Sequence, residues 1–356
     1  MLAIKFVLVS VFLTFAVLFP ASARGETITT GQPLLMLVPE YPRAVGGPFP
    51  FGAQDLSVWR TRVPRIEEVD IRSSLDKTIQ KALFYTPTGD SPKPLLVVLH
   101  SWSENYLQNI GIPYAIFAER NGWALIHPDH RGPYRKPEAV ASELSLGDVL
   151  DAVEYAKKRA RFDSSRIYLV GYSGSAMTSL VLAGKHPEIW AGVVSWVPIY
   201  DLVDWYEWMQ KTSPERHYAG EIAAACGGRP IPGSPAEKEC RRRSPSQYLS
   251  NARGRVPVYL GLGIWDHLVP PNHALRAFND LASPNERIPE GQLRELDRTR
   301  RVPHELVFSG KRPLYEQAGA KVLLERSSLG STVTIFQGGH DIIYNAGLAW
   351  LAERRR

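Results

Sequence analysis

The stretch Gly171-Tyr172-Ser173-Gly174-Ser175 joins two segments of opposite character. Residues 166–170 (RIYLV) form an apolar run typical of a strand, and residues 174–184 favour a helix. A serine at a sharp turn from a strand into a helix is presented at the end of a sheet, and its neighbours must be small because bulky ones would collide. The last residue of the usual pattern G-x-S-x-G is Ser175 here. The stretch predicts an α/β fold and marks Ser173 as a candidate nucleophile.

Strand-like and helix-like segments alternate along most of the chain. Such alternation predicts a mostly parallel central sheet with helices on both faces. The expected strands are residues 79–85, 94–100, 123–126, 166–170, 190–197, 256–262 and 332–336. The expected helices are residues 112–120, 142–161, 174–184, 272–282 and 341–354.

Three regions interrupt or precede this alternation. Residues 24–66 are rich in Pro and Gly and predict an extended N-terminal arm, followed by one catalytic domain over residues 67–356. Residues 200–256 break the pattern where folds of this kind insert a lid or cap. Residues 284–320 form a second, charged insertion.

The first 23 residues have the features of a secretory signal peptide. Lys5 precedes an apolar run over residues 6–19, and residues 20–23 (PASA) supply a small-residue cleavage site. The run is shorter than the ~20 residues that a bilayer span needs, so no stable membrane anchor is expected. We therefore expect a secreted or periplasmic protein whose mature chain starts near Arg24.

The chain has only two cysteines, Cys226 and Cys240. An even pair in an exported protein predicts a disulfide. A metal site is not expected there because no His or Asp stands at ligand spacing beside the pair. No other metal or cofactor is implied.

The charge balance is moderately basic, with 42 Lys and Arg against 36 Asp and Glu. Two arginine runs, residues 241–243 and 354–356, hold much of the excess. We interpret them as solvated surface, with contact to an acidic glycan or a membrane surface as the alternative. Nucleic acid is not an expected partner, because there is no basic helix or nucleic-acid-binding motif.

A nucleophilic Ser173 needs a base to take its proton and an acid to orient that base. In folds of this kind the partners follow the serine in the order acid, then histidine, each in a loop after a later strand. Asp266 follows the strand expected at 256–262, and His340 follows the last strand. We assign Asp266 as the orienting acid and His340 as the general base.

Three nearby residues compete for these roles. Asp201, after the strand expected at 190–197, is the rival acid. His267 adjoins Asp266 and is expected at the rim, and Asp341 is too close to His340 in sequence to orient it well.

The developing oxyanion needs hydrogen-bond donors. The Gly174 N–H, directly after the nucleophile, is one. The second is expected from the loop after the strand at 94–100, with Trp102 favoured over Ser101. His100, in the same loop, is interpreted as structural.

With these motifs the chain resembles the α/β-hydrolase superfamily, and within it the prolyl-oligopeptidase-like catalytic domains of peptidase family S9. The resemblance covers residues 75–355 and rests on PDHRG at 128–132, DSSRI at 163–167, RSP at 243–245, WDHLVP at 265–270 and GGH at 338–340. It implies a serine hydrolase that forms an acyl-enzyme on Ser173, which water activated by His340 then hydrolyses.

Aromatic residues are expected to line the mouth of the site, where they could stack on a sugar, hold an aryl acyl group or form an apolar pocket. The candidate substrate-binding residues are Trp196, Tyr200, Trp205 and Trp265. The expected substrates are small esters, peptides or polysaccharide-linked esters, with an acetyl or feruloyl esterase of cell-wall polysaccharide as the alternative. Glu104, Asp204 and Glu207 could hold a peptide N-terminus. A non-catalytic binding protein on the same fold is the hypothesis from a different class.

Overall fold

The computed structural model describes residues 35–44, 54–212 and 217–356. The expected signal peptide and cleavage site lie outside the described residues, as does the first part of the expected arm.

A nine-stranded sheet forms the centre of the fold, with the order β1-β2-β4-β3-β5-β6-β7-β9-β8. The six strands from β4 to β9 in this order are parallel, and antiparallel pairs complete the two edges, β1 with β2 and β2 with β4 at one and β8 with β9 at the other. The strands are β1 (Glu67–Arg72), β2 (Ile79–Tyr85), β3 (Lys93–Val98), β4 (Ala124–Pro128), β5 (Phe162–Tyr172), β6 (Gly192–Trp196), β7 (Val258–Gly263), β8 (Val322–Ser328) and β9 (Ser331–Phe336).

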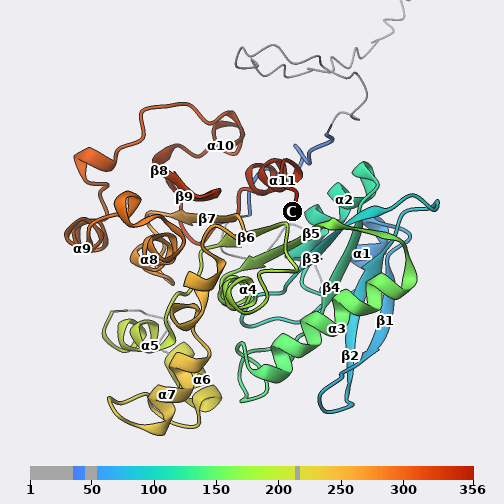
Figure 1. The fold of residues 1–356 in the computed structure, drawn as a ribbon, viewed down its shortest axis with the longest axis horizontal. Coiled ribbons are helices and arrows are strands. Elements are labelled where there is room, and N and C mark those ends of the chain that lie inside the picture. The colour runs from blue at the N-terminus through green and yellow to red at the C-terminus, as the bar shows by residue number, and fades with distance from the viewer. Residues whose placement is uncertain (1–34, 45–53, 213–216) are drawn as a thin grey trace, which may run out of the picture. The chain divides into compact units, whose positions relative to one another are not determined.

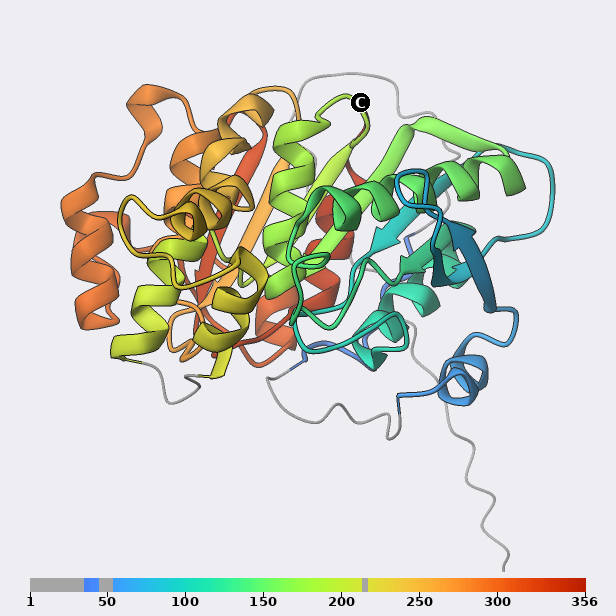
Figure 2. The same cartoon turned by 90° about the horizontal axis from the view of Figure 1, so that it is seen from below.

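Helices cover both faces of the sheet (Figure 1). On one face lie α2 (Ile112–Asn121) and α11 (Tyr344–Ala352), and on the other lie α3 (Glu143–Arg159), α4 (Gly174–Lys185) and α8 (Asn272–Leu281). Figure 2 views the second of these faces. This arrangement confirms the predicted α/β-hydrolase fold.

The central strands are mostly apolar because helices bury both of their faces. Every residue of β4, β6 and β7 is buried. The start of α3 also follows the expectation, since the Ser142 side chain accepts a hydrogen bond from the Ser145 N–H at 3.1 Å.

Several elements have no counterpart among the expected ones. In the edge strand β1 only Ile71 is buried, so this strand lacks the apolar run that marks a central strand. The edge strand β8 falls just after the second insertion. Residues of the expected arm form the short helix α1 (Leu56–Arg62), whose Trp59 is buried, so the arm is not extended there.

Both predicted insertions contain helices. The first contains α5 (Leu202–Lys211), α6 (His217–Cys226) and α7 (Pro235–Arg242), which lie together in Figure 1. The second contains α9 (Glu290–Thr299) and α10 (Pro313–Gln317).

The predicted disulfide is present. Cys226 at the end of α6 is bonded to Cys240 in α7, 14 residues further on. The bond fixes the two helices of the first insertion to each other.

Because these are the only cysteines, a reductant acts on one bond. We expect the double variant Cys226→Ser/Cys240→Ser to lose about 3 kcal/mol of unfolding free energy, since closing a loop of this length restricts the unfolded chain by about that amount. Urea titration of both proteins, with and without dithiothreitol, measures the loss. Equal midpoints for the oxidised and reduced wild type would contradict the expectation.

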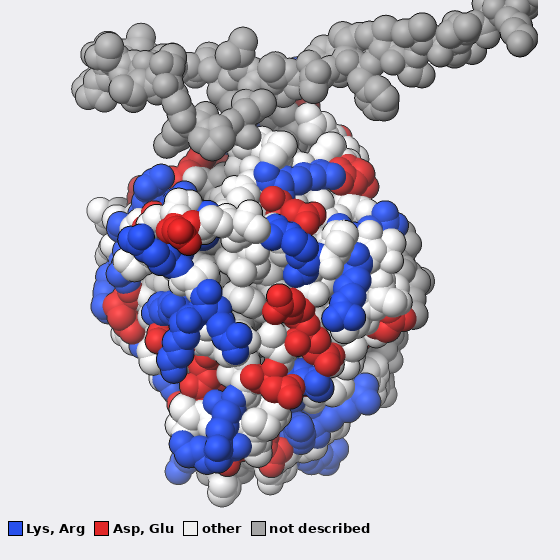
Figure 3. Space-filling model, turned by 90° about the vertical axis from the view of Figure 1, so that its right-hand side faces the viewer, with Lys and Arg blue, Asp and Glu red and all other residues white. Residues whose placement is uncertain are grey.

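Positive and negative side chains are interspersed on the face that carries β1 and β2 (Figure 3). Lys81 Nζ, for example, lies 2.9 Å from Glu68 Oε2 and 3.2 Å from Asp70 Oδ1. Within residues 35–44, 54–212 and 217–356, none of the helices has the length and apolar character that crossing a bilayer requires.

Candidate active site

Ser173 occupies the sharp turn between β5 and α4. Its backbone has φ 57° and ψ −120°, a conformation that costs free energy for a residue with a side chain. The Ser173 N–H donates to the Trp196 carbonyl oxygen at 2.9 Å, which ties the turn to the end of β6. Ser173 is partly exposed, whereas Tyr172 and Gly174 beside it are buried. The fold thus presents this serine at the carboxyl end of the parallel strands.

Two backbone N–H groups meet beside Ser173. Gly174 begins α4, so its N–H has no acceptor within the helix. A Cβ atom on Gly174 would lie only 3.1 Å from Trp102 Cα, which is tighter than an ordinary contact, so glycine favours this close approach. Among the described residues the Trp102 N–H also has no acceptor. Gly174 and Trp102 therefore bring two free donors together, an arrangement suited to an oxyanion.

Ser101 does not supply such a donor, which corrects that part of the expectation. The Ser101 N–H donates to Gln108 Oε1 at 2.7 Å, and Gln108 Nε2 donates to Ser101 Oγ at 2.7 Å. The Gln108 amide thus bonds to both the N–H and the hydroxyl oxygen of Ser101 and fixes the loop that precedes Trp102.

His340 and Asp266 form a buried hydrogen-bonded pair. The distance from His340 Nδ1 to Asp266 Oδ2 is 2.7 Å, and the two residues are 5% and 1% exposed. The other carboxylate oxygen, Asp266 Oδ1, accepts from the N–H groups of Leu268 and Val269 at 2.7 and 2.9 Å. The carboxylate therefore holds the proton of His340 on Nδ1 and leaves Nε2 as a base.

The acid loop and the base loop are joined along their backbones. The Trp265 N–H donates to the Gly338 carbonyl oxygen at 2.9 Å, next to the end of β9. A Cβ atom on Gly263 would lie 2.3 Å from the Gly339 carbonyl oxygen, so the loops approach each other as closely as glycine allows. This contact sets the position of His340 relative to Asp266.

Tyr172 connects the nucleophile turn to the base loop. Its hydroxyl donates to the His340 carbonyl oxygen at 2.8 Å, and the centres of the two rings lie 5.1 Å apart. Burial, reinforced by the charges of Asp266 and Asp341, holds the pKa of Tyr172 well above its ordinary value. The hydroxyl therefore keeps its proton and remains a donor.

The rival acids have other partners. Asp201 Oδ1 accepts from the N–H groups of Val203 and Asp204 at the start of α5, at 2.9 and 3.2 Å. Asp341 Oδ2 lies 2.6 Å from Arg43 Nη2 and accepts from the Gly339 N–H at 2.7 Å. Neither makes a hydrogen bond to the His340 ring, and among the described residues only Asp266 does.

Ser173 Oγ makes no hydrogen bond to a described residue. Contacts between a nucleophile and its base are often long without substrate and shorten in the complex. The turn, the Asp266–His340 pair and the two free N–H groups all lie at the carboxyl end of the parallel strands. Together they supply the parts that acyl transfer needs.

Ser175, the irregular last residue of the pentapeptide, is completely buried. Its hydroxyl accepts from the Tyr172 N–H at 3.0 Å and lies 3.0 Å from the Tyr172 carbonyl oxygen and 3.2 Å from the Leu99 carbonyl oxygen. The side chain therefore links the first turn of α4 to the end of β5 and to the residue after β3. It does not face substrate.

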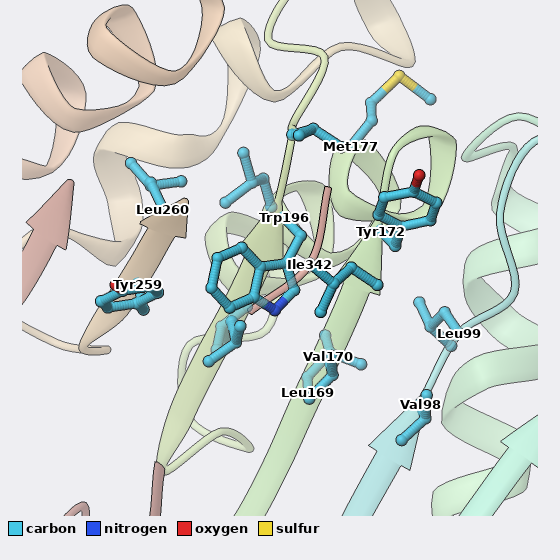
Figure 4. Packing of buried hydrophobic residues seen from close by; sticks show 14 of the residues in the cluster. Val98, Leu99, Leu169, Val170, Tyr172, Met177, Trp196, Tyr259, Leu260 and Ile342 are labelled. Carbon is cyan, nitrogen blue, oxygen red and sulfur yellow. The ribbon is translucent and has the colours of Figure 1, made fainter. Parts of the chain in front are cut away.

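Two of the aromatic residues that were expected to bind substrate lie in the protein core instead. Trp196 is 0% exposed, and Figure 4 shows its indole packed in the core near Ile342. Trp205 is 2% exposed, and its indole N–H donates to the Leu268 carbonyl oxygen at 2.8 Å. Strand β6 is buried on both faces, and α5 packs inward, so neither tryptophan reaches a substrate.

Tyr200 also contacts protein groups and not the expected substrate position. Its hydroxyl donates to Asp280 Oδ2 at 2.7 Å, and its N–H donates to His273 Nδ1 at 2.9 Å. Burial lowers the pKa of His273 to about 4, so the imidazole is neutral and Nδ1 accepts. Tyr200 thus fastens the chain after β6 to α8 and is not a substrate contact.

Trp265 is the one of the four whose ring is open to a ligand, with 58% of the residue exposed. It lines a cavity of about 370 Å³ together with His340, His267, Arg43, Gly319 and Gln337. His267 therefore lies at the rim, as expected.

Three buried histidines lie behind the oxyanion loop, and they do not form a metal site. The rings of His100 and His130 stack with their centres 4.0 Å apart, and Nδ1 of His100 and of His127 lie 2.9 Å from backbone carbonyl oxygens. Burial holds the pKa of His130 well below its ordinary value, so this ring is uncharged. Within the described part of the chain, no group of three or more His, Cys, Asp or Glu residues is arranged to hold a metal ion.

Glu221 was not anticipated from the sequence. Its Oε2 accepts from the Trp102 indole N–H at 2.7 Å, and its Oε1 lies 3.0 Å from Arg135 Nε. The first insertion is thereby bonded to the residue that carries a free N–H of the site. A single Glu in a helix of the insertion gives no signal for this contact, which depends on tertiary packing.

Residues 142–292 match the model of the family described as the Prolyl oligopeptidase family. A probable acetylxylan esterase A of Aspergillus flavus is 27% identical over 132 residues, which cover 33% of this chain and 42% of that protein. Feruloyl esterase B of Thermothelomyces thermophilus is 27% identical over 140 residues, covering 36% and 47%. The solved structure of uncomplexed Pyrococcus horikoshii acylaminoacyl peptidase has 19% identity and a TM-score of 0.48, over 61% of this chain and 34% of that chain. The matched part thus spans less than half the length of each of these proteins.

Proposed function

We propose that the chain is a serine hydrolase of the prolyl oligopeptidase family, whose model residues 142–292 match. The observation that carries the proposal is the buried Asp266–His340 pair, 2.7 Å apart, at the same edge of the sheet as the strained Ser173. The adjacent N–H groups of Gly174 and Trp102 support it.

In the first step, His340 Nε2 takes the proton of Ser173 as the serine oxygen attacks the substrate carbonyl. The oxyanion is stabilised by the Gly174 and Trp102 N–H groups, and Asp266 stabilises the imidazolium. The bond to the leaving group then breaks, and His340 donates the proton to the leaving oxygen or nitrogen. In the second step, a water activated by His340 releases the acid and restores Ser173.

An ester is the favoured substrate. The carboxylates that were expected to hold a peptide amine all have partners. Asp204 Oδ2 lies 2.7 Å from Arg276 Nη1, Glu207 Oε2 lies 3.1 Å from Lys211 Nζ, and Glu104 Oε2 accepts from Gln54 Nε2 at 2.9 Å. The names of the curated relatives, acetylxylan and feruloyl esterases, agree with this choice. A peptide is the second candidate, and the family match favours it.

Labelling with a fluorophosphonate tests the proposal. We expect the wild type to incorporate one equivalent, and mass spectrometry of the peptides to locate it on Ser173. No label under conditions that label a control hydrolase would instead indicate a non-catalytic binding protein. Ethyl acetate, acetylated xylan and aminoacyl anilides, assayed in parallel, then separate esterase from peptidase.

Export completes the proposal. Residues 1–23 have the sequence of a signal peptide, and the Cys226–Cys240 disulfide fits an oxidising compartment. Mass spectrometry of the protein recovered outside the cytoplasm should show a chain that starts near Arg24. A full-length chain confined to the cytoplasm would contradict export.

A further inference from the structure

The cavity of about 370 Å³ beside His340 contacts the base but not Ser173. During hydrolysis the leaving group receives its proton from the base. The leaving oxygen must therefore come within hydrogen-bonding distance of His340. A cavity on the side of the base is placed for the leaving group and not for the acyl group.

The walls of this cavity suit a neutral sugar ring. Trp265 offers a flat apolar surface that is 58% exposed, which can stack on the C–H face of a pyranose. Gln337, at the rim, is exposed and can bond to hydroxyl groups. The charge of Arg43 is offset by Asp341 at 2.6 Å, so the cavity has little attraction for an anion.

Arg43, which forms one wall of the cavity, belongs to the described part of the N-terminal arm. Backbone hydrogen bonds of 2.9 and 3.0 Å join Ala44 to Ile342, two residues after His340. Arg43 is thereby held against the base loop, so its place in the cavity wall is fixed by the fold.

We propose that this cavity is the leaving-group subsite for the sugar of a carbohydrate ester, with Trp265 as its stacking platform. The proposal rests on the serine hydrolase function and specifies the alcohol that it releases.

The test compares Trp265→Ala with Trp208→Ala in the full chain. Trp208 is a matched control because it lines a separate cavity of about 310 Å³ between α5 and α8. For each protein kcat/KM is measured on acetylated xylobiose and on ethyl acetate. We expect the ratio of the two values to fall about tenfold in W265A and to keep the wild-type value in W208A. An unchanged ratio in W265A, or a wild type that hydrolyses ethyl acetate but not the sugar ester, would overturn the subsite.

A binding measurement separates this outcome from failure of the proposed function. Xylotriose should quench the tryptophan fluorescence of Ser173→Ala, and adding W265A should abolish the quenching. Quenching by xylotriose in a protein that no fluorophosphonate labels would retain the sugar site and reject the hydrolase. Labelling by the fluorophosphonate without quenching by xylotriose would retain the hydrolase and reject the sugar site.

The contacts of Ser175 carry a second, independent inference. Its hydroxyl joins the start of α4, which bears the Gly174 N–H, to Leu99, which leads into the loop bearing the Trp102 N–H. We infer that Ser175 is a positioning residue that sets the separation of the two oxyanion donors.

Ser179 provides the matched control, because it is another fully buried serine of α4 with two hydrogen bonds, to the Ala176 carbonyl oxygen at 2.8 Å and to Ser195 Oγ at 2.7 Å. We expect Ser175→Ala to lower kcat about tenfold with KM unchanged, and to raise the Ki of an aryl trifluoromethyl ketone in parallel, because its adduct is an oxyanion. Ser179→Ala should change neither. If both variants lowered the free energy of unfolding by the same amount and left kcat and Ki unchanged, Ser175 would be merely structural.

Discussion

Ser173→Ala is expected to lower kcat on the order of 10⁶-fold, because the variant has no oxygen to form the acyl-enzyme. The free energy of unfolding should stay close to that of the wild type. Ser173 is partly exposed, and its Oγ makes no hydrogen bond to a described residue. Initial rates on the best ester of the substrate panel, with the variant at high concentration, measure the effect.

Host esterases are the main source of error in such an assay. The same purification applied to Ser173→Ala gives the background directly, and fluorophosphonate incorporation reports active enzyme independently of turnover. Turnover within tenfold of the wild type, with no contaminating label, would exclude Ser173 as the nucleophile.

Asp266→Asn is expected to lower kcat on the order of 10⁴-fold. The carboxylate now accepts from the Leu268 and Val269 N–H groups through Oδ1 and from His340 Nδ1 through Oδ2. An amide has one acceptor oxygen, and the two backbone donors claim it. The NH₂ group would then face His340 Nδ1, force its proton onto Nε2 and remove the base.

Asp201→Asn is the matched control. Asp201 is buried and caps α5, and its Oδ2 also accepts from Ser246 Oγ at 2.7 Å. Asn caps helices as well as Asp does, so we expect this change to alter stability by less than about 1 kcal/mol and to leave kcat within a few-fold. Urea titration and steady-state kinetics on both variants decide between the acids. A larger loss of kcat in Asp201→Asn than in Asp266→Asn would reverse the assignment.

The central sheet and its helices could be predicted because their patterns are local. The buried strands β4, β6 and β7 are short apolar runs, and α3 and α4 lie within two residues of their expected ends. Ser173, Asp266 and His340 were assigned as nucleophile, acid and base for a related reason. Each follows a parallel strand, and such strands end at one edge of the sheet.

The errors arose where tertiary packing decides. A tryptophan near a strand end has the same sequence signature whether it faces solvent or the core, so Trp196 and Trp265 could not be distinguished. The use of the Ser101 N–H depends on Gln108, seven residues away in an irregular loop. Edge strand β1 has too few buried residues to give a strand pattern.

Trp102 limits how freely the first insertion can be exchanged. Its backbone N–H is the second donor of the proposed oxyanion site, while its indole N–H donates to Glu221 Oε2 of α6. A graft that replaced residues 200–256 with the corresponding segment of another hydrolase would remove that acceptor and leave a buried donor without a partner. Chimeras would therefore lose catalytic rate along with the specificity that the graft was meant to change. A graft that retains a carboxylate at the position of Glu221 avoids this, so specificity can be redesigned around that single contact.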